Sequence, residues 1–437
     1  MLDIKYIREH TKEVKQAVKN RNKKADVDQI LELDKERREL IAKIDGKRAE
    51  QKALSFSPLA SSVIPAKAGI QNTKAKKIKL EIKKYEERLK EVEELLAKLV
   101  PAVPNIPLPD VPVGKDEKDN EVMRTVGKPE KFDFEPKDHL ALGEALGIID
   151  VERAAKISGN RFCYLKSGAA RLQMALIQYV YDIALQHDFT PVIPPVIVKR
   201  ETAAASGHPE AVGDEAYHLD QDDQFLVGTS EQSILPMYRD EILDESILPI
   251  RYLGYSTCFR REAGSYGKDM RGILRQHQFD KLEMFVFCKP EDSEHEHERI
   301  LRVEEELMQG LELPYRVVKL CTGDIGYPSA KTYDIETWLP SQNKYRETHS
   351  TSNCTDYQTR NLNIKFRRVL PLPEGELEGV GGKKKGGATL EFVHALNGTA
   401  FALGRIIIAI MENYQQFDGS IIVPKVLQKY SGMKIIK

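Results

Sequence analysis

Two segments near the N-terminus carry apolar residues at the spacings of long, exposed helices. From Val27 to Leu54 the chain is dense in Leu, Ile, Glu, Lys and Arg, with one Gly and no Pro. From Lys74 to about Val100 the apolar positions alternate spacings of four and three, which is a heptad seam. These seam positions are Ile78, Ile82, Tyr85, Leu89, Val92, Leu96 and Leu99. The pattern predicts two helices that fold back as an antiparallel, coiled-coil hairpin.

The stretch between these helices differs from both. Residues 55–73 lack the heptad, and Pro58, Pro65 and Gly69 predict a linker that interrupts any helix. The second helix should end at the Pro-rich run PAVPNIPLPDVPVG. We therefore predict an N-terminal helical arm over 1–100 with an unusual tip at 55–73, and a Pro-rich linker over 101–120.

Beyond the linker the pattern changes to short β-like runs separated by helical stretches and turns. The runs are PVIPPVIV, QFLVG, YSTCFR, DKLEMFVFC and TLEFVHAL. This alternation predicts an α+β domain over 121–437, with a largely antiparallel sheet flanked by helices.

Composition is that of a water-soluble protein. Charged residues make up 30% and hydrophobic residues 41% of the 437, and no apolar run approaches the roughly 18 residues of a spanning helix. The first residues mix acids and bases, unlike a secretory signal, and the five cysteines are scattered singly, which gives no zinc-ligand spacing. We expect a cytoplasmic protein without membrane partner or zinc. The formal net charge of −1 does not decide for or against a nucleic-acid partner.

The segment from Thr257 to Glu283 is the richest in candidate chemistry. It reads as a strand, a loop and a return strand, and period-two alternation would place Arg260 and Glu262 on one face. Arg275, Phe279 and Glu283 would likewise share a face. A guanidinium group can bind phosphate and an aromatic ring such as Phe279 can stack on a base. The alternative for any single residue is a solvated hairpin with charges paired across strands; the whole set favours a nucleotide site.

These residues also carry a family resemblance. FRREAGSYGKDMRGILRQHQFDKLEMF resembles motif 2 of class II aminoacyl-tRNA synthetases, in the form found in seryl-tRNA synthetases. PVIPPVIV resembles motif 1, LVGTSEQS the serine-recognition loop, YRETHSTSN a segment that contacts ATP and magnesium, and FVHALNGTAFALGRIIIAIMEN motif 3. The five stretches occur in the family's order, and the resemblance extends to the N-terminal hairpin. It implies a class II synthetase fold and a homodimer.

The resemblance implies roles in ATP binding. Arg260 would hold the α-phosphate and Arg405 the γ-phosphate, and both guanidinium groups neutralise charge that builds up in the transition state. Glu347 and Ser350 would hold Mg²⁺, which prefers carboxylate and hydroxyl oxygens. The complete implied ATP set is Arg260, Arg261, Glu262, Gln276, Phe279, Glu347, Thr348, His349, Ser350 and Arg405.

It also implies a serine subsite. Glu283 and Thr399 would address the substrate hydroxyl, and Thr229 and Glu231 the ammonium group. A site built to hydrogen-bond a hydroxyl rejects the analogue lacking it by about 10⁴ to 10⁵. The complete implied serine set is Thr229, Ser230, Glu231, Arg260, Glu283 and Thr399.

The expected macromolecular partner is tRNA(Ser); whether tRNA(Sec) is a second substrate is open. Lysines concentrate on the second helix of the arm, where they can contact phosphates, and the alternative is a solvated coiled-coil face. The lysines expected to bind tRNA are Lys76, Lys77, Lys83 and Lys84. A Gly- and Lys-rich stretch at 375–388 is expected to be a loop that approaches the tRNA acceptor end or, alternatively, a disordered surface loop.

Three other functions compete with this one. An amino-acid ligase that loads a carrier protein resembles zinc-dependent relatives without the hairpin, whereas this chain has the hairpin and no ligand cluster. A class II synthetase for another amino acid shares the scaffold. A catalytically silent RNA-binding or coiled-coil protein would be expected to lose Arg260, Glu262 or Arg405, and all three are present.

Overall fold

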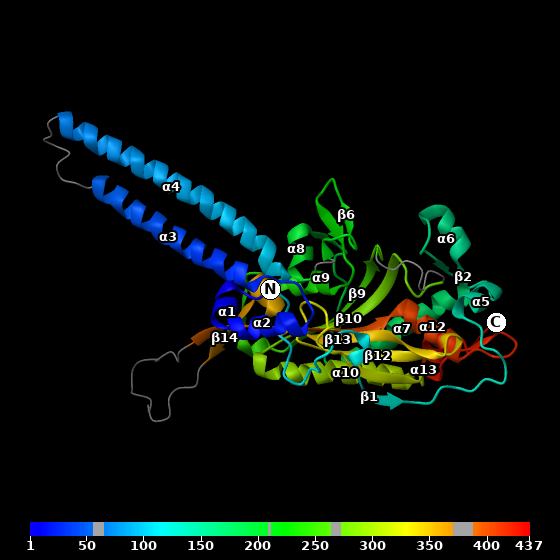
Figure 1. Ribbon diagram of the computed structural model, residues 1–437. Coiled ribbons are helices and arrows are strands. Elements are labelled where there is room, and N and C mark those ends of the chain that lie inside the picture. The colour runs from blue at the N-terminus through cyan, green and yellow to red at the C-terminus, as the bar shows by residue number, and fades with distance from the viewer. Residues whose placement is uncertain (56–64, 209–210, 264–271, 370–387) are drawn as a thin grey trace, which may run out of the picture. The chain divides into compact units, whose positions relative to one another are not determined.

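The computed structural model describes residues 1–55, 65–208, 211–263, 272–369 and 388–437, and the side chains of residues 55 and 65–72 are not described. The chain divides into two compact units, Met1–Pro104 and Asn105–Lys437. Figure 1 shows the first as helices and the second as a mixture of strands and helices. No helix within the described ranges is long and apolar enough to cross a membrane.

The first unit contains a helical hairpin preceded by two short helices. Its helices are α1 (Ile4–Glu9), α2 (Thr11–Asn20), α3 (Val27–Ser55) and α4 (Pro65–Leu99). The α1 helix begins at Asp3, whose side chain accepts a hydrogen bond from the Tyr6 backbone N–H and so caps the first turn. Arg8 of α1 forms an ion pair of 2.7 Å with the buried Asp34 of α3, which ties the short helices to the hairpin.

Helices α3 and α4 run antiparallel. Ion pairs join early residues of α3 to late residues of α4 and the reverse. They are Arg37–Glu93, Glu36–Arg88, Lys47–Glu81, Arg48–Glu86 and Glu50–Lys74. Four residues of the predicted seam on α4 are buried, Ile78, Ile82, Val92 and Leu96, and so are the apolar residues Ile30, Leu33, Leu40 and Ile44 of α3. Burial of this stripe holds the pair together, because exposed ion pairs contribute little.

The sequence prediction of a linker up to residue 73 is wrong at its C-terminal end. Helix α4 begins at Pro65, and Gly69 lies within it. Proline is compatible with the first helical position because its missing N–H would have no partner there, and its φ is already helical. An interior glycine costs only about 1 kcal/mol, which a long packed helix tolerates. Residues 56–64 lie outside the described residues.

The second unit is built on an eight-stranded sheet of order β1-β11-β12-β13-β16-β10-β9-β4. Every pairing is antiparallel except that of β4 with β9. The strands are β1 (Glu121–Val126), β4 (Thr190–Val192), β9 (Ile250–Phe259), β10 (Gln278–Cys288), β11 (Tyr315–Lys319), β12 (Lys331–Leu339), β13 (Lys344–Asn353) and β16 (His394–Ala402). The prediction of an α+β domain with a largely antiparallel sheet is confirmed.

Helices and smaller sheets surround the eight-stranded sheet. The helices are α5 (His139–Ala145), α6 (Val151–Ser158), α7 (Ser167–Gln186), α8 (Arg200–Ala205), α9 (Glu231–Ile234), α10 (Ser293–Gly310), α11 (Tyr357–Leu362), α12 (Leu403–Asn413) and α13 (Lys425–Ser431). The remaining strands are β2 (Ile149–Asp150), β3 (Tyr164–Leu165), β5 (Ile197–Lys199), β6 (Tyr217–Leu219), β7 (Gln224–Leu226), β8 (Ile242–Asp244), β14 (Lys365–Val369), β15 (Ala388–Phe392), β17 (Ile421–Ile422) and β18 (Ile435–Ile436).

Alternation along β10 separates two cores. Met284 and Val286 pack with buried residues of α7, α10 and α12 on one face of the sheet. Phe285 and Phe287 pack on the opposite face with residues of α8, α9 and α11. Phe279, Lys281 and Glu283 have the same parity as these two phenylalanines, so their side chains leave the sheet on that second face. This arrangement fixes where polar side chains of β10 are presented.

Candidate active site

An open cleft lies on the large sheet, with an empty volume of about 580 Å³ that includes adjoining solvent. Its lining comes from the end of β9, the segment before β10, β10 itself, β13, and the junction of β16 with α12. The lining residues are Arg260, Glu262, Ile273, Leu274, Arg275, Gln276, Phe279, Lys281, Glu347, Thr348, Thr399, Ala402, Gly404 and Arg405. Most of the predicted ATP set is therefore brought together, from stretches far apart in the sequence.

The route by which these residues converge differs from the sequence prediction. Strand β9 ends at Phe259 and β10 begins only at Gln278, so Arg260, Glu262 and Arg275 lie outside the strands. Glu262 has a left-handed backbone with φ of 51°, which no strand alternation can include. The prediction that period two aligns these residues is thus wrong. For Phe279 and Glu283, which are within β10, the shared face is confirmed.

Arg260 is held at the edge of the cleft by backbone and by an aromatic ring. Its Nε and Nη2 atoms each donate to the Gly228 carbonyl at 3.2 Å. Its guanidinium carbon lies 5.4 Å from the centre of the Phe279 ring, a cation–π distance. Gly228 immediately precedes the Thr229–Glu231 loop, so these contacts join the motif 2 arginine to the predicted serine-recognition loop.

A second guanidinium group faces a carboxylate across the same cleft. Arg275 Nη1 lies 3.1 Å from Glu262 Oε2. The pair sets a hydrogen-bond acceptor and a cation beside the Phe279 ring, from two segments on opposite sides of the undescribed residues 264–271. An acceptor, a cation and an aromatic plane are the groups that a purine nucleotide can use.

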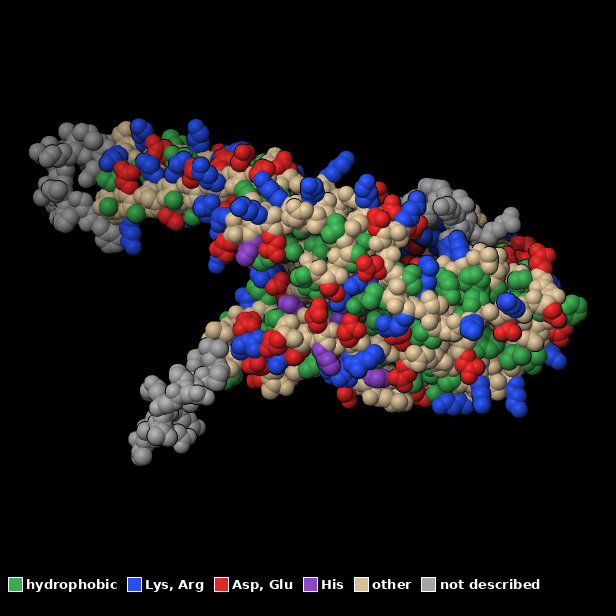
Figure 2. Space-filling model, turned by 60° about the horizontal axis from the view of Figure 1, so that its bottom comes forward, with side chains coloured by type: hydrophobic (Ala, Val, Ile, Leu, Met, Phe, Trp, Pro, Cys, Tyr) green, Lys and Arg blue, Asp and Glu red, His purple; other side chains and the backbone are tan. Residues whose placement is uncertain are grey.

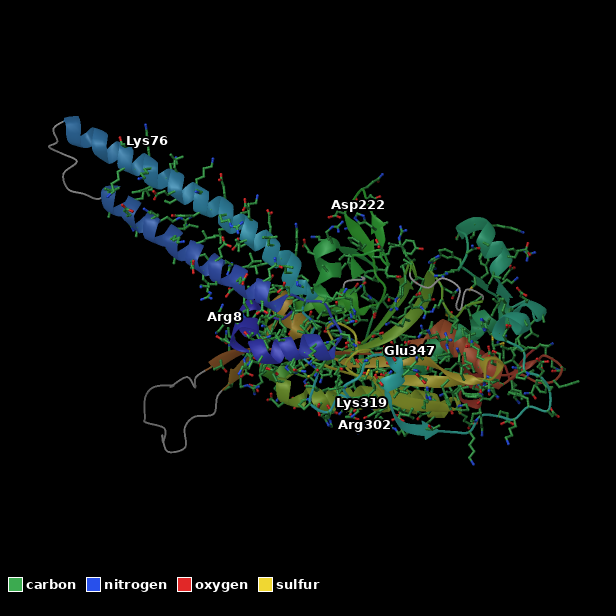
Figure 3. The ribbon with its side chains drawn as sticks, in the orientation of Figure 1. Arg8, Lys76, Asp222, Arg302, Lys319 and Glu347 are labelled. Atoms are coloured by element: carbon green, nitrogen blue, oxygen red, sulfur yellow. The ribbon has the colours of Figure 1, made fainter. Side chains whose placement is uncertain are left out.

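The third guanidinium group, that of Arg405, pairs with Glu347. Arg405 Nη1 donates to Glu347 Oε1 at 2.9 Å and to the Glu347 carbonyl at 3.0 Å. Desolvation in the cleft opposes ionisation of Glu347, but Arg405 and, more weakly, Arg260 and Arg275 outweigh it and lower the pKa of this carboxyl. Glu347 is labelled on β13 in Figure 3. Glu347 is therefore ionised in a cleft rich in guanidinium groups.

Asp334 of β12 forms a carboxyl pair with Glu347. It lies opposite Ser350 in the strand register, and the Ser350 side chain hydrogen-bonds it. Burial first, and the charge of Glu347 next, raise the pKa of Asp334 well above its ordinary value. Its Oδ1 atom is buried and has no hydrogen-bond partner within the described ranges. A cation placed here would relieve both the repulsion and the missing contact.

Three residues of the predicted ATP set lie outside the cleft lining: Ser350, whose side chain hydrogen-bonds Asp334, and also His349 and Arg261. The His349 side chain is buried against Phe401, and burial lowers its pKa to about 3. Arg261 stacks over the Tyr217 ring at 5.0 Å and donates to the Ala216 carbonyl at 3.1 Å. Neither side chain lines the cleft, whereas Thr348 does.

Of the two predicted hydroxyl-binding residues, Thr399 lines the cleft, and Glu283 lies buried behind it in contact with Thr399. Thr399 Oγ1 donates to Glu283 Oε2 at 3.3 Å, because Thr399 and Glu283 are partners in the β10–β16 register. Lys281, two residues along the same face, forms an ion pair with Glu283. Burial raises the pKa of Glu283, and the Lys281 ammonium group opposes that rise. Sequence reasoning missed Lys281, although its period-two spacing from Glu283 was available.

The Thr229–Glu231 loop is almost completely buried. The Glu231 backbone N–H donates to Thr229 Oγ1 at 3.3 Å, and the Ser230 hydroxyl donates to the Gly254 carbonyl at 3.4 Å. The Ser230 side chain is thereby directed at β9. Glu231 Oε1 accepts from Gln358 of α11 at 2.6 Å, so the loop is supported from a third element.

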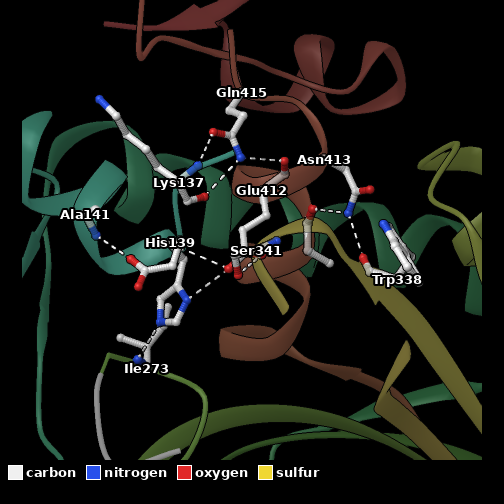
Figure 4. Close-up of polar contacts among 11 residues, drawn as sticks. Lys137, His139, Ala141, Ile273, Trp338, Ser341, Glu412, Asn413 and Gln415 are labelled. Carbon is white, nitrogen blue, oxygen red and sulfur yellow. Dashed lines mark hydrogen bonds and ion pairs between the residues drawn. The ribbon is translucent and has the colours of Figure 1, made fainter. Parts of the chain in front are cut away.

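A polar network behind the cleft was also missed by sequence reasoning (Figure 4). His139 Nε2 accepts from the backbone N–H of Ile273 at 3.2 Å, while His139 Nδ1 lies 3.3 Å from Glu412 Oε1. One tautomer, with its proton on Nδ1, satisfies both contacts. Ile273 lines the cleft, and its carbonyl lies 3.2 Å from where a Cβ on Gly404 would stand. The network thus fixes the 273–276 segment against α12. The histidine that does so lies in α5, and the sequence around it gives no indication of this role.

Fold and cleft are matched by comparison with known proteins. A family model described as "tRNA synthetase class II core domain (G, H, P, S and T)" matches residues 217–371, and one described as "Seryl-tRNA synthetase N-terminal domain" matches residues 1–107. The antiparallel sheet and its cleft therefore define a class II aminoacyl-tRNA synthetase.

Relatives that match along the full length of the chain identify the family within this class. The chain is 43% identical to the serine–tRNA ligase of Thermodesulfovibrio yellowstonii and 47% identical to that of Thermosipho africanus, with 100% of both chains covered in each case. A crystal structure of seryl-tRNA synthetase from Pyrococcus horikoshii complexed with ATP is 40% identical, with a TM-score of 0.86, covering 100% of this chain and 99% of that one. The chain belongs to the seryl-tRNA synthetase family.

Proposed function

We propose that the cleft activates L-serine with ATP and that the chain then transfers serine to the 3′ end of tRNA(Ser). The observation that carries the proposal is the convergence of Arg260, Arg275 and Arg405 with the Phe279 ring on one cleft. Thr399 also lines this cleft and hydrogen-bonds the buried Glu283. Three cations and an aromatic plane suit a triphosphate nucleotide, and the buried carboxylate and hydroxyl suit a small hydroxylated amino acid. Family membership supports the same assignment.

The first half-reaction would be an in-line displacement at phosphorus. A serine carboxylate oxygen forms a bond to the α-phosphorus, the bond to the bridging β-phosphate oxygen breaks, and pyrophosphate leaves with that electron pair. Arg260 would stabilise charge on the α-phosphate and Arg405 on the γ-phosphate, so no protein side chain acts as nucleophile. The N-terminus of α12, which carries Gly404 and Arg405, adds its partial positive charge near the phosphates.

The adenine would stack on Phe279. Glu262, held by Arg275, would accept from the adenine amino group, and Gln276 would contact the nucleotide from the cleft wall. Gln276 is oriented by its Nε2 atom, which lies 2.9 Å from Cys163 Sγ. Thr348 would contribute to the wall near the phosphates.

Magnesium would accompany ATP at Glu347 and Ser350. The residues present fit a hard cation, since a carboxylate and a hydroxyl are the donors that Mg²⁺ prefers. Asp334 strengthens the fit, because its buried Oδ1 has no hydrogen-bond partner in the described part of the chain and it lies beside the Glu347 charge. When bound, the ion would neutralise phosphate charge; the chain's contribution is to hold these oxygens in place.

Serine would be selected by its hydroxyl and ammonium groups. Glu283 and Thr399 would hydrogen-bond the hydroxyl, and alanine would bring no hydroxyl to these two buried groups. Glu231, with Thr229, would bind the ammonium group. Discrimination against alanine therefore needs no second, hydrolytic site.

The arm would supply affinity for tRNA. The four predicted lysines are exposed on α4, and Lys76, Lys77 and Lys84 form no ion pair with any described residue, while Lys83 lies 3.8 Å from Glu87. Lys76 is labelled in Figure 3, and Figure 2 shows Lys and Arg intermixed with Asp and Glu along the hairpin. Cations without a protein partner remain available to phosphate. The Gly- and Lys-rich stretch predicted at 375–388 lies, up to residue 387, outside the described residues.

The assembly would be a cytoplasmic homodimer. Support comes from the family and from the motif 1 region, where Ile193 is 79% and Ile197 46% exposed. Exposed apolar side chains beside an edge strand are typical of a subunit interface. Light scattering at micromolar concentration tests the dimer, and a monomer would contradict it.

The activity is tested by ATP–pyrophosphate exchange with each amino acid in turn, without tRNA. We expect serine alone to stimulate exchange. Charging of tRNA(Ser) and tRNA(Sec) transcripts is then measured in parallel, which decides whether the second RNA is a substrate. Absence of stimulation by any amino acid in folded protein would contradict the proposed function.

A further inference from the structure

Glu231 receives a direct hydrogen bond from a buried side chain of another element. Gln358, on α11, is completely buried. Its Nε2 atom donates to Glu231 Oε1 at 2.6 Å and to the Ser206 carbonyl at 2.8 Å. Because a carboxylate and a carbonyl are both acceptors, only the amide NH₂ can face them, which fixes the orientation of the Gln358 side chain.

This orientation leaves the oxygen of the Gln358 amide in an unfavourable environment. Gln358 Oε1 is buried and has no hydrogen-bond partner within the described ranges. An unsatisfied buried acceptor is unfavourable, so the fold gains little stability from placing a glutamine there. Both amide donors nevertheless point at the Glu231 carboxylate and at the end of α8.

We propose that Gln358 is a positioning residue for serine recognition, which holds the Glu231 carboxylate so that Oε2 meets the α-ammonium group of serine. His208 Nε2, 3.9 Å from Glu231 Oε1, lies on the same side of the carboxylate as Gln358. Contacts to Oε1 leave Oε2 as the oxygen for the substrate. This inference rests on the proposed role of Glu231 and extends it to an element outside the recognised motifs.

The test is a double-mutant cycle on serine binding. The variants are Gln358→Met, Glu231→Gln and the double variant, assayed by ATP–pyrophosphate exchange in the full chain. Methionine matches the length of glutamine and removes both donors. A hydrogen bond to a charged group contributes enough to predict a rise of roughly 10- to 100-fold in the serine KM of Gln358→Met. We expect the ATP KM to change less than about threefold, and the effect on serine to shrink in the Glu231→Gln background.

Each outcome bears on the proposal. A rise in serine KM that is as large in the Glu231→Gln background as in the wild type overturns it, because Gln358 would then act by another route. If Glu231→Gln raises the serine KM and Gln358→Met does not, the inference fails while the proposed function stands. If Glu231→Gln itself leaves the serine KM unchanged, the assigned role of Glu231 fails, and the inference with it.

Two further variants separate positioning from stability. Gln428, on α13, donates through its amide to the Val423 carbonyl and does not line the cleft. Gln428→Met should therefore leave both KM values unchanged. Gln358→Glu keeps the shape but replaces the amide with a carboxyl beside Glu231, so its serine KM should rise with pH as the new carboxyl ionises. A pH-independent serine KM equal to that of the wild type would overturn the proposal even if Gln358→Met does not fold.

Discussion

Arg405 Nη1 and Glu347 Oε1 lie 2.9 Å apart across the cleft, so the proposed γ-phosphate ligand and the proposed metal ligand are already paired. Arg405 lowers the pKa of Glu347, and Glu347 raises the pKa of Arg405, so each residue favours the ionised form of the other. Phosphate and metal binding are therefore expected to be coupled through this pair.

Arg405→Ala should lower exchange activity by a factor of about 10² to 10³, as loss of one preorganised cation does elsewhere. It should also raise the pKa of Glu347, since a neighbouring cation is lost. The carboxylate would then be protonated at pH values at which it is ionised in the wild type.

The measurement is the Mg²⁺ concentration for half-maximal exchange, followed against pH. In the variant that concentration should rise more steeply as pH falls than in the wild type. Arg239→Ala, which removes a surface partner of Glu201, is the control and should retain the wild-type profile. Equal pH dependence in Arg405→Ala and the wild type would count against the coupling.

Lys281→Met should impair serine binding through Glu283. Burial raises the pKa of Glu283 and Lys281 opposes the rise, so removing the lysine should raise that pKa further. If the ionised form accepts from the serine hydroxyl, the serine KM of the variant should be roughly 10-fold or more above the wild type at pH 7 and should decrease as pH rises.

The measurement is serine KM at several pH values by pyrophosphate exchange. Lys319→Met is the matched control, because Lys319 is also buried and its Nζ donates to the Asp110 carbonyl at 3.0 Å, outside the cleft lining. It should lower stability without changing the serine KM. A pH-independent KM in Lys281→Met would exclude the proposed charge relation.

The contrast between predicted and missed residues has a physical origin. Phe279 and Glu283 could be aligned from sequence because both lie within a continuous strand, where alternation holds. Arg260, Glu262 and Arg275 could not be aligned in this way, because β9 ends at Phe259 and β10 begins at Gln278. Glu262 also has a left-handed backbone, which changes the direction of the chain. Their convergence was anticipated only through resemblance to a family.

Residues that act from other elements leave no local pattern. His139 begins α5 and Gln358 lies in α11, and each reaches the site only because the sheet order brings distant segments together. The antiparallel hairpin was predictable from the two helical segments and the linker between them. The start of α4 at Pro65 was missed because proline was treated as an interruption rather than as a first helical residue.

His139→Ala should weaken ATP binding. It leaves the buried Ile273 N–H without its acceptor, which costs about 1–3 kcal/mol of unfolding free energy. The 273–276 segment lines the cleft, so the ATP KM should rise while the serine KM changes little. Thermal unfolding and pyrophosphate exchange measure the two effects.

Ser341→Ala provides the matched control for His139. Ser341 Oγ donates to Glu412 Oε2 at 2.7 Å, on the far side of the same carboxylate. Its loss should lower stability but leave the His139–Ile273 contact and the ATP KM unchanged. If both variants raise the ATP KM equally, the rise comes from disturbing the whole network and not from loss of the His139–Ile273 hydrogen bond.

Replacement of Lys76 and Lys77 by alanine should weaken tRNA binding and leave amino-acid activation unchanged. Each lost phosphate contact should reduce the slope of log K against log salt by about 0.7–0.9. Lys12→Ala with Lys19→Ala removes the same charge from exposed positions of α2 and serves as the control. Equal loss of affinity in the two pairs would indicate a general charge effect.

The most direct test of the account is pyrophosphate exchange by Arg260→Ala, compared with the wild type and with the surface variant Arg200→Ala. Arg260 borders the cleft and joins the serine loop to the proposed nucleotide site through Gly228. The account predicts serine-dependent exchange in the wild type and in Arg200→Ala, and a loss of about 10³-fold or more in Arg260→Ala without change in thermal stability. Serine-dependent exchange that survives in Arg260→Ala would contradict the assignment of this cleft.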